Sequence, residues 1–483
     1  MPPRLSNSAR FLSAACATAL LSACAVGPRA PEATLPPPAS GAFIGQGLTA
    51  QVSPAEARSD WWRLYDDPVL DGLVAQALAE NNELEAAAAN LRLVRASLSE
   101  ARSARLPSTS LSGAGQRGRQ AAYATPGAGP VSPDDSGAIT ETYDVGLDVA
   151  YEIDLFGRVS SAIRAARADA DAAQAALEVV QVTVAAETAR AYADACSANA
   201  QIAVAERSIG LQQETADLTR RLLDLGRGTG LDTARADSAL QSTRATLPPL
   251  RAQRDAALFR LSTLTGVTPA EASQAARDCA RPPQLSRPIP VGDGAALLAR
   301  RPDVRRAERE LASAAARVNV AVASLYPTIQ LGGSLGATAF DASDLGDDAA
   351  FRFSVGPLIS WSFPNIAATR ARIRQAEAGT DIALANFDQT VLVALQETET
   401  ALSAYANELD RRAALTTARD RAADAERLSR LRFDAGADSF LILLDAQRTL
   451  AQADAALAAS EAQVSNNQIT LFKALAGGWG VTR

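Results

Sequence analysis

The sequence predicts an α+β membrane protein in which each chain contributes four β-strands to a barrel shared between copies and continues into very long helices. Three observations predict this class. The N-terminus is typical of a bacterial lipoprotein, two hairpins alternate apolar and polar residues, and long stretches without proline favour helix. Because the hairpins and helices occur twice, the chain contains two internal repeats.

The composition excludes several functional classes. The 483 residues include 47 basic and 54 acidic side chains, a net charge of −7, and no histidine. The acidic balance argues against a nucleic-acid partner, and the lack of histidine removes His-dependent triads and His-ligated metal sites. Four cysteines show no CxxC spacing, so we expect no metal, no cofactor, no catalytic residue and no disulfide framework. We interpret Cys196 as a small buried side chain and Cys279 as an uninformative loop position.

The N-terminus predicts export and a lipid anchor. Two arginines precede a short apolar run, Phe11–Leu21, which is too short to span a bilayer and has the form of a signal peptide. The sequence "LSAC" then matches a lipoprotein cleavage box, so we assign residues 1–23 to the signal peptide, Cys24 to acylation and residues 24–60 to a tether. Ala25 after this cysteine is typical of lipoproteins sent to the outer membrane. An ordinary signal peptide cleaved nearby is the alternative.

The repeat is visible as matched segments. Tyr151 and Trp361 lie 210 positions apart in similar sequences, as do Gly226 and Gly436. We place the first repeat at 61–266, an inter-repeat segment at 267–296 and the second repeat at 297–483. Each repeat has the same order of elements: helix, strand, loop, strand, very long helix, tight turn, helix.

The hairpins, at about 106–154 and about 326–363, are the only segments suited to crossing a membrane. No segment of the mature chain reaches about 18 consecutive apolar residues, so we expect no transmembrane helix. From Tyr143 to Asp154 the odd positions are apolar and should face lipid, while Asp144, Asp148 and Glu152 should face water. Four strands cannot close a barrel, since the smallest membrane barrels use about eight, so several chains must contribute. The alternative is a soluble domain whose sheet packs on the helices.

The sequence also predicts very long helices and tight turns between helices. Residues 159–225 contain no proline, and a helix of that length would reach roughly 100 Å, which suits a rod crossing a compartment better than a globule. An intracellular coiled coil would explain the helices but neither the signal peptide nor the hairpins. We predict tight turns at about 224–232 and about 434–439, where Gly226 and Gly436 favour positive φ, and where Asp232 and either Asp438 or Ser439 cap the next helix. Gly157 and its counterpart Pro364 should bend the chain between strand and helix.

Several motifs resemble the TolC-like outer-membrane efflux proteins, specifically their OprM/NodT lipoprotein branch. The resemblance runs from about Trp61 to Gly480, and its carriers are "WWRLYDDPVLDGLVAQALAENNELEAA", "YEIDLFGR", "RRPDVRRAERELASAAARVNVAVASLYPTIQL", "LLDAQRTL" and "LFKALAGGW". It implies a homotrimer with a 12-stranded β-barrel in the outer membrane, continued by a periplasmic α-helical barrel. It also implies an equatorial domain built from about Gly266–Leu297 plus the flanks of the chain.

The same resemblance implies an exit duct without enzymatic activity. Such a duct is joined through a periplasmic adaptor to an inner-membrane resistance–nodulation–division transporter, and it contacts outer-membrane lipid. An exit duct for type I protein secretion, or a structural envelope lipoprotein without a channel, are the alternatives.

The resemblance also implies functional residues at the turns. The adaptor would contact a tip surface formed by Gly226, Gly436, Arg432, Asp434 and Asp224, although Leu222 replaces the arginine in the first repeat. The glycines could alternatively serve only the turns. Asp445 would line the periplasmic entrance together with its repeat counterpart Arg235, and a surface salt bridge is the alternative for both.

Overall fold

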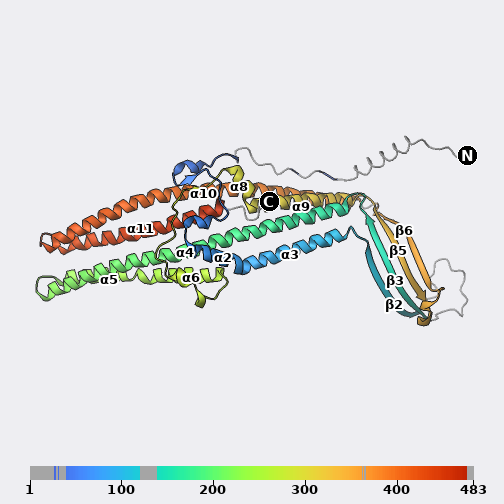
Figure 1. The fold of residues 1–483 in the computed structure, drawn as a ribbon, viewed down its shortest axis with the longest axis horizontal. Coiled ribbons are helices and arrows are strands. Elements are labelled where there is room, and N and C mark those ends of the chain that lie inside the picture. Colours follow the sequence, from blue (N-terminus) through green and yellow to red (C-terminus); the bar gives the residue numbers. More distant parts are fainter. Residues whose placement is uncertain are drawn as a thin grey trace. The chain divides into compact units, whose positions relative to one another are not determined.

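The computed structural model describes residues 27–28, 31, 40–119, 139–361, 363 and 366–475. Cys24 and Pro364 lie outside the described residues. The chain divides into two compact units, which we describe separately. The sheet unit comprises Arg92–Asp171 and Arg309–Ala385 with the described residues before Ala33, and the helical unit comprises the rest (Figure 1).

The sheet unit contains the four predicted strands. They are β2 (Ser108–Arg119), β3 (Ile139–Ile153), β5 (Thr328–Ala339) and β6 (Phe351–Ser360), in the order β2-β3-β5-β6. All three pairings are antiparallel, and the short 3-10 turn η6 (Ala342–Gly346) joins β5 to β6. Among the described strands, β2 and β6 have one neighbour each, so both edges of the sheet can accept another strand.

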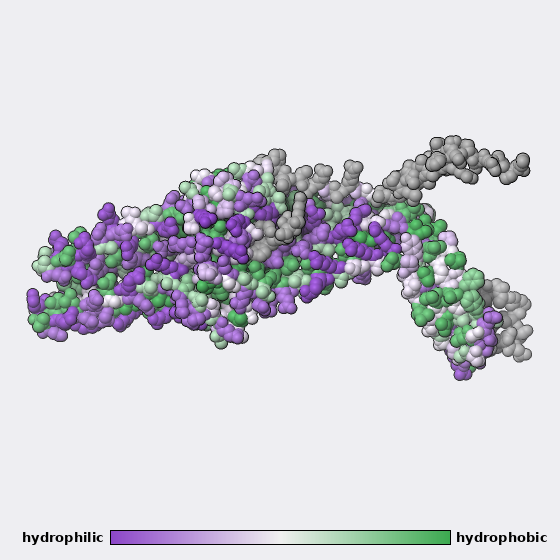
Figure 2. Space-filling view, viewed as in Figure 1, coloured by the Kyte–Doolittle hydropathy of each residue, from purple (hydrophilic) through white to green (hydrophobic). Residues whose placement is uncertain are grey.

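The register places the apolar residues of all four strands on one face. Leu111 pairs with Leu147, Leu147 with Leu335, and Leu335 with Phe353. Directly paired side chains lie on the same side of a sheet, so this row crosses the whole sheet. The face is exposed: Leu147 keeps 39% and Phe353 73% of its accessible surface, and Figure 2 shows hydrophobic side chains over these strands.

The opposite face is polar and internally bonded. Asp144 accepts hydrogen bonds from Thr338 Oγ1 at 2.7 Å and from Arg352 Nη2 at 2.8 Å. Ser334 and Ser354 share a hydrogen bond of 2.7 Å on the same face. The alternation predicted along β3 therefore extends to a sheet with two unlike faces.

The connection from β3 to the long helix α4 (Arg158–Asp224) is held by its own polar groups. The Asp154 carboxylate accepts hydrogen bonds from the amides of Val159 at 2.9 Å and Ser160 at 2.8 Å, which satisfies donors in the first turn of α4. Gly157 has a φ of +73°, a conformation that glycine adopts without strain. Arg158 Nε donates to Glu152 Oε1 at 2.8 Å, so the side chains link strand and helix.

Helices account for most of the chain. Two are very long, α4 with 67 residues and α10 (Ile366–Asp434) with 69, as their lack of interior proline predicts. Within the described residues, no helix combines the length and the apolar character needed to cross a membrane. The remaining helices of at least 13 residues are α2 (Pro68–Glu80), α3 (Asn82–Ser103), α5 (Gly230–Arg244), α6 (Leu247–Leu264), α9 (Pro302–Ala323) and α11 (Phe440–Leu475).

Several small elements also belong to the helical unit. The two-residue strands β1 (Val52–Ser53) and β4 (Ile289–Pro290) pair in parallel, and the chain between the repeats also forms η5 (Pro269–Glu271), α7 (Gln274–Arg277) and α8 (Gly294–Arg300). Near the N-terminus lie η2 (Ile44–Leu48) and η3 (Trp61–Tyr65). Trp61 is 1% exposed and stacks on Phe472 of α11 with ring centroids 4.8 Å apart, so the "WWRLY" motif forms core here.

One expectation about the cysteines is wrong. Cys196 of α4 and Cys279 of the inter-repeat segment form a disulfide with an S–S distance of 2.06 Å. Asn199 Nδ2 reinforces the junction by donating to the carbonyl oxygens of Arg277 at 2.9 Å and Cys279 at 2.8 Å. The two cysteines are 83 positions apart, and only the folding of the inter-repeat segment onto α4 brings them together.

Candidate functional site at the helix tips

The two tight turns share one backbone structure. Gly226 and Gly436 have φ values of +69° and +73°. The Gly226 amide donates to the Leu223 carbonyl at 2.9 Å and the Arg227 amide to the Leu222 carbonyl at 2.8 Å, and the second turn repeats both bonds one repeat later. This is the Schellman pattern, which satisfies carbonyls at a helix C-terminus. Nothing lies within 4 Å of a Cβ built on either glycine, so backbone conformation alone calls for glycine at both positions.

The predicted cap of α5 needs correction. Thr229, not Asp232, is the N-cap of α5, and its Oγ1 accepts from the Asp232 amide at 3.2 Å. Asp232 supports this cap by accepting from Thr229 Oγ1 at 2.6 Å. In the second turn α11 begins at Phe440, so Ser439, one of the two predicted caps, occupies the N-cap position. The Asp438 carboxylate instead accepts hydrogen bonds from Arg432. A polar residue just before a helix is a good cap signal, but several candidates stood side by side in both turns.

Arg432 and Asp438 close the second turn with a bidentate ion pair. Arg432 Nε lies 2.8 Å from Asp438 Oδ2, and Nη2 lies 2.9 Å from Oδ1. This hydrogen bond, together with the positive charge, lowers the pKa of the Asp438 carboxyl. The repeat counterparts are Leu222 and Gly228, so the first turn has no equivalent pair. The two turns, with the helix ends that they join, are called the tips below. They share a backbone conformation but differ in charge.

The tips expose apolar and acidic side chains together. Leu225 is 70% and Leu431 58% exposed, and the predicted contact residues Asp224 and Asp434 are also exposed. We find no ion pair to either aspartate among the described residues. Exposed leucines beside charges at the end of a helical hairpin form a surface suited to a protein partner.

The helices on either side of the first turn, α4 and α5, pack against α11, which follows the second turn. A buried cluster joins Ala216, Ala236 and Leu240 to Phe440 and Leu444. In the same region Thr215 Oγ1 donates to Gln447 Oε1 at 3.1 Å. Both turns consequently lie at the same end of the helical unit, as Figure 1 shows.

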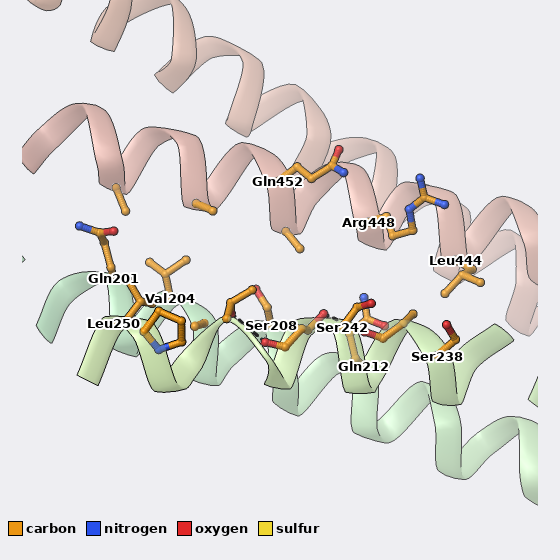
Figure 3. A pocket seen from close by; sticks show the side chains of 18 of the residues that line it. Gln201, Val204, Ser208, Gln212, Ser238, Ser242, Leu250, Leu444, Arg448 and Gln452 are labelled. Carbon is orange, nitrogen blue, oxygen red and sulfur yellow. Dashed lines mark hydrogen bonds between the residues drawn. The ribbon is translucent and has the colours of Figure 1, made fainter. Parts of the chain in front are cut away.

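The predicted entrance residues Asp445 and Arg235 are both exposed and do not pair with each other. No ion pair to either side chain occurs in the part of the chain that the structure describes, so the surface salt bridge considered for them is not formed there. Arg235 lines a cavity of about 890 Å³ between α4, α5, α6 and α11. Figure 3 shows this cavity from close by, with Leu444 of α11 pointing toward the α4 and α5 side.

Sequence reasoning missed a pair of arginines that holds the end of α11. Arg300 Nη2 donates to the Leu475 carbonyl at 2.8 Å, and Arg301 Nη1 donates to the Ala474 carbonyl at 3.0 Å. Arg301 is 7% exposed and also contacts Asp303 and Glu397, each at 2.7 Å. The signal was present in "RRPDV", since Arg side chains can bond the last carbonyls of a helix, but the partner helix lies about 170 residues away in the chain.

Comparison with known proteins agrees with this architecture. Residues 73–267 and 295–477 match the family model described as outer membrane efflux protein. The chain is 30% identical over 440 residues to the probable efflux pump outer membrane protein TtgC of Pseudomonas putida, covering 89% of this chain and 87% of that protein. It is 28% identical over 484 residues to nodulation protein T of Rhizobium leguminosarum bv. viciae, covering 98% and 94%.

A solved structure described as the outer-membrane channel OprN superposes with a TM-score of 0.87 at 35% identity, covering 94% of this chain and all of that one. The predicted α+β fold class and the resemblance are thereby confirmed. The chain belongs to the outer membrane efflux protein family, whose members are outer-membrane channels rather than enzymes.

Proposed function

We propose that this protein is the exit duct of a tripartite efflux pump and that three copies form its channel in the outer membrane. The observation that most directly supports this proposal is the sheet of β2, β3, β5 and β6, which has one exposed apolar face, one polar face and two open edges. Three copies contribute 12 strands, which close a barrel whose apolar face meets lipid and whose polar face lines water. Residues 61–266 and 297–483 remain our two repeats, with 267–296 between them.

The tips support the proposed contact with a periplasmic adaptor. Each tip offers a helical hairpin with exposed leucines, and the second adds the Arg432–Asp438 pair. An adaptor of this kind links the duct to an inner-membrane resistance–nodulation–division transporter, which supplies the energy. The names of relatives such as the pump protein TtgC favour efflux over protein secretion.

Asp445 supports the proposal of a charged entrance. Its carboxylate is exposed and forms no ion pair with any described residue. Three copies around one axis would form a ring that favours cations and resists close approach of the three side chains. Acylation of Cys24 would add a lipid anchor to the membrane-embedded barrel, and mass spectrometry of the mature N-terminus tests that assignment.

The experiment that tests the duct is recording from the purified oligomer in a planar bilayer. We expect stepwise ion conductance from a particle whose mass, measured by native mass spectrometry, is three times that of the mature chain. A particle without conductance would instead indicate a structural envelope lipoprotein. Crosslinking in cells followed by purification identifies the adaptor, and the absence of any periplasmic partner would contradict the pump assignment.

A further inference from the structure

The cavity beside the entrance residues has the size of a small-molecule site. Its volume is about 890 Å³, and its walls come from α4, α5, α6 and α11, all within the helical unit. Ligand pockets commonly have volumes of about 300 to 1,000 Å³. In Figure 3, Leu444 of α11 and Ser238 of α5 lie on opposite sides of the same space.

The charge of the walls has one sign. Arg235 and Arg448 are the charged residues of the lining, and no aspartate or glutamate belongs to it. Neither arginine forms an ion pair within the described residues. In a chain with net charge −7, two unpaired guanidinium groups around one cavity create a local positive potential. A guanidinium binds carboxylate, sulfonate or phosphate oxygens through two parallel hydrogen bonds.

The remaining walls are apolar or neutral. Val204, Leu250 and Leu444 provide hydrocarbon surface along the cavity. Gln212 also lines it, is 3% exposed, and its Oε1 has no hydrogen-bond partner among the described residues. Buried polar atoms are rarely left unpaired, so this oxygen is a candidate acceptor for a hydrogen bond from a ligand.

We infer that this cavity binds amphiphilic organic anions that carry a hydrogen-bond donor. The anionic group would lie on Arg235 and Arg448, the hydrocarbon body along the apolar wall, and the donor at Gln212. The inference rests on the proposed function in one respect, because such an anion would reach the cavity as an exported substrate.

The test measures binding of 5-aminonaphthalene-1-sulfonate to the purified oligomer by equilibrium dialysis, with empty detergent micelles as the blank. This probe carries an anion, an aromatic body and an amine donor. We expect 1-aminonaphthalene, which lacks the sulfonate, to bind at least about tenfold more weakly, since charged hydrogen bonds are the strong ones. Naphthalene-1-sulfonate, which lacks the amine, should bind more weakly by a smaller factor.

Variants locate the site. Arg235→Gln and Arg448→Gln should each raise the Kd of the probe about fivefold, and the double variant more. Arg207→Gln is the matched control, because Arg207 is an exposed arginine of α4 that does not line the cavity. Its Kd should stay within about twofold of the unaltered value.

Two results would overturn the inference: an unchanged Kd in the double variant, or equal affinity for the probes with and without sulfonate. The second comparison uses the unaltered protein and does not depend on whether a variant folds. If the unaltered oligomer conducts ions but shows either result, the anion site fails and the duct stands. If it does not conduct, the proposed function fails.

Discussion

At the scale of single residues, the turns show how one backbone can carry two different chemistries. Gly226 and Gly436 make equivalent turns, yet only the second is closed by an ion pair, between Arg432 and Asp438. The first uses Thr229 and Asp232 instead. A partner that contacts both tips therefore meets two unlike surfaces, although both derive from the same repeat.

The ion pair predicts a pH response confined to the second tip. Because the folded pKa of Asp438 lies below the ordinary value of 3.8, the pair contributes fully above that value and is lost as pH falls through the folded pKa. Hydrogen–deuterium exchange of peptides covering the second turn, corrected for intrinsic rates, should rise over this range. Asp438→Asn should show the faster exchange at neutral pH already, while the first turn stays unchanged in both proteins. A uniform response of both turns would contradict this assignment.

Asp445 predicts a change in ion selectivity. If three copies of this exposed carboxylate surround the entrance, Asp445→Ala should reduce the preference for cations and alter single-channel conductance. Asp388→Ala is a suitable control, since Asp388 is also an exposed aspartate on a long helix, α10. Reversal potentials measured in a salt gradient decide the matter. Identical selectivity in Asp445→Ala and the unaltered protein would remove Asp445 from the entrance.

At the scale of elements, long helices depend on fixed ends. The last carbonyls of α11 are held by Arg300 and Arg301, which lie where α8 meets α9. A second tie, between Cys196 and Cys279, attaches the inter-repeat segment to α4. Both ties join segments far apart in the chain, so each restrains helices that local sequence alone would leave independent.

Arg301→Ala should destabilise the fold strongly. The substitution leaves the Ala474 carbonyl and two carboxylates without their buried partner, which typically costs about 3 kcal/mol. The measurement is the thermal unfolding temperature of the oligomer. Arg317→Ala provides the comparison, because it removes an exposed pair with Asp169 and should cost under about 1 kcal/mol. Equal shifts in the two variants would show that burial of Arg301 does not matter.

The disulfide predicts a redox-dependent stability. Replacing both Cys196 and Cys279 by serine should lower stability by about 2–4 kcal/mol, because the bridge restricts the unfolded chain. A reducing agent should lower the unfolding temperature of the unaltered protein toward that of the double variant and leave the variant itself unchanged. A melting temperature insensitive to both reduction and substitution would indicate that the bridge adds no stability.

At the scale of the whole molecule, the sheet is the element that a single chain leaves incomplete. Its two open edges and its exposed apolar face are both liabilities in water. Assembly and insertion into lipid would remove both at once. The obligatory oligomer that we propose thus follows from the surface of one chain.

Adjacent substitutions on opposite faces of β6 test this arrangement. Val355 is 76% exposed on the apolar face, and Val355→Arg should cost about 2–4 kcal/mol if that face meets lipid. Ser354 points to the polar face, so Ser354→Arg should be tolerated. The amount of oligomer recovered from outer membranes on a semi-native gel compares the two. Equal recovery would contradict a lipid-facing position for Val355.

Local sequence determined the elements of this protein. Alternation along Tyr143–Asp154 predicted a strand, and the absence of proline predicted the long helices α4 and α10. The glycines at 226 and 436 predicted the turns. Each of these signals depends on the backbone within a few residues. The motifs were also sufficient to identify the family. The sequence assigned both Arg432 and Asp438 to the second turn, but it did not predict the ion pair between them.

Only the tertiary structure decided the long-range partners. Three features join residues that are distant in the chain. They are the disulfide between Cys196 and Cys279, the hydrogen bonds from Arg300 and Arg301 to the last carbonyls of α11, and the cavity lined by Arg235 and Arg448. No periodicity or spacing specifies such pairs. They depend on which faces of separate helices come together when the apolar surface is buried, and that is a property of the packed molecule.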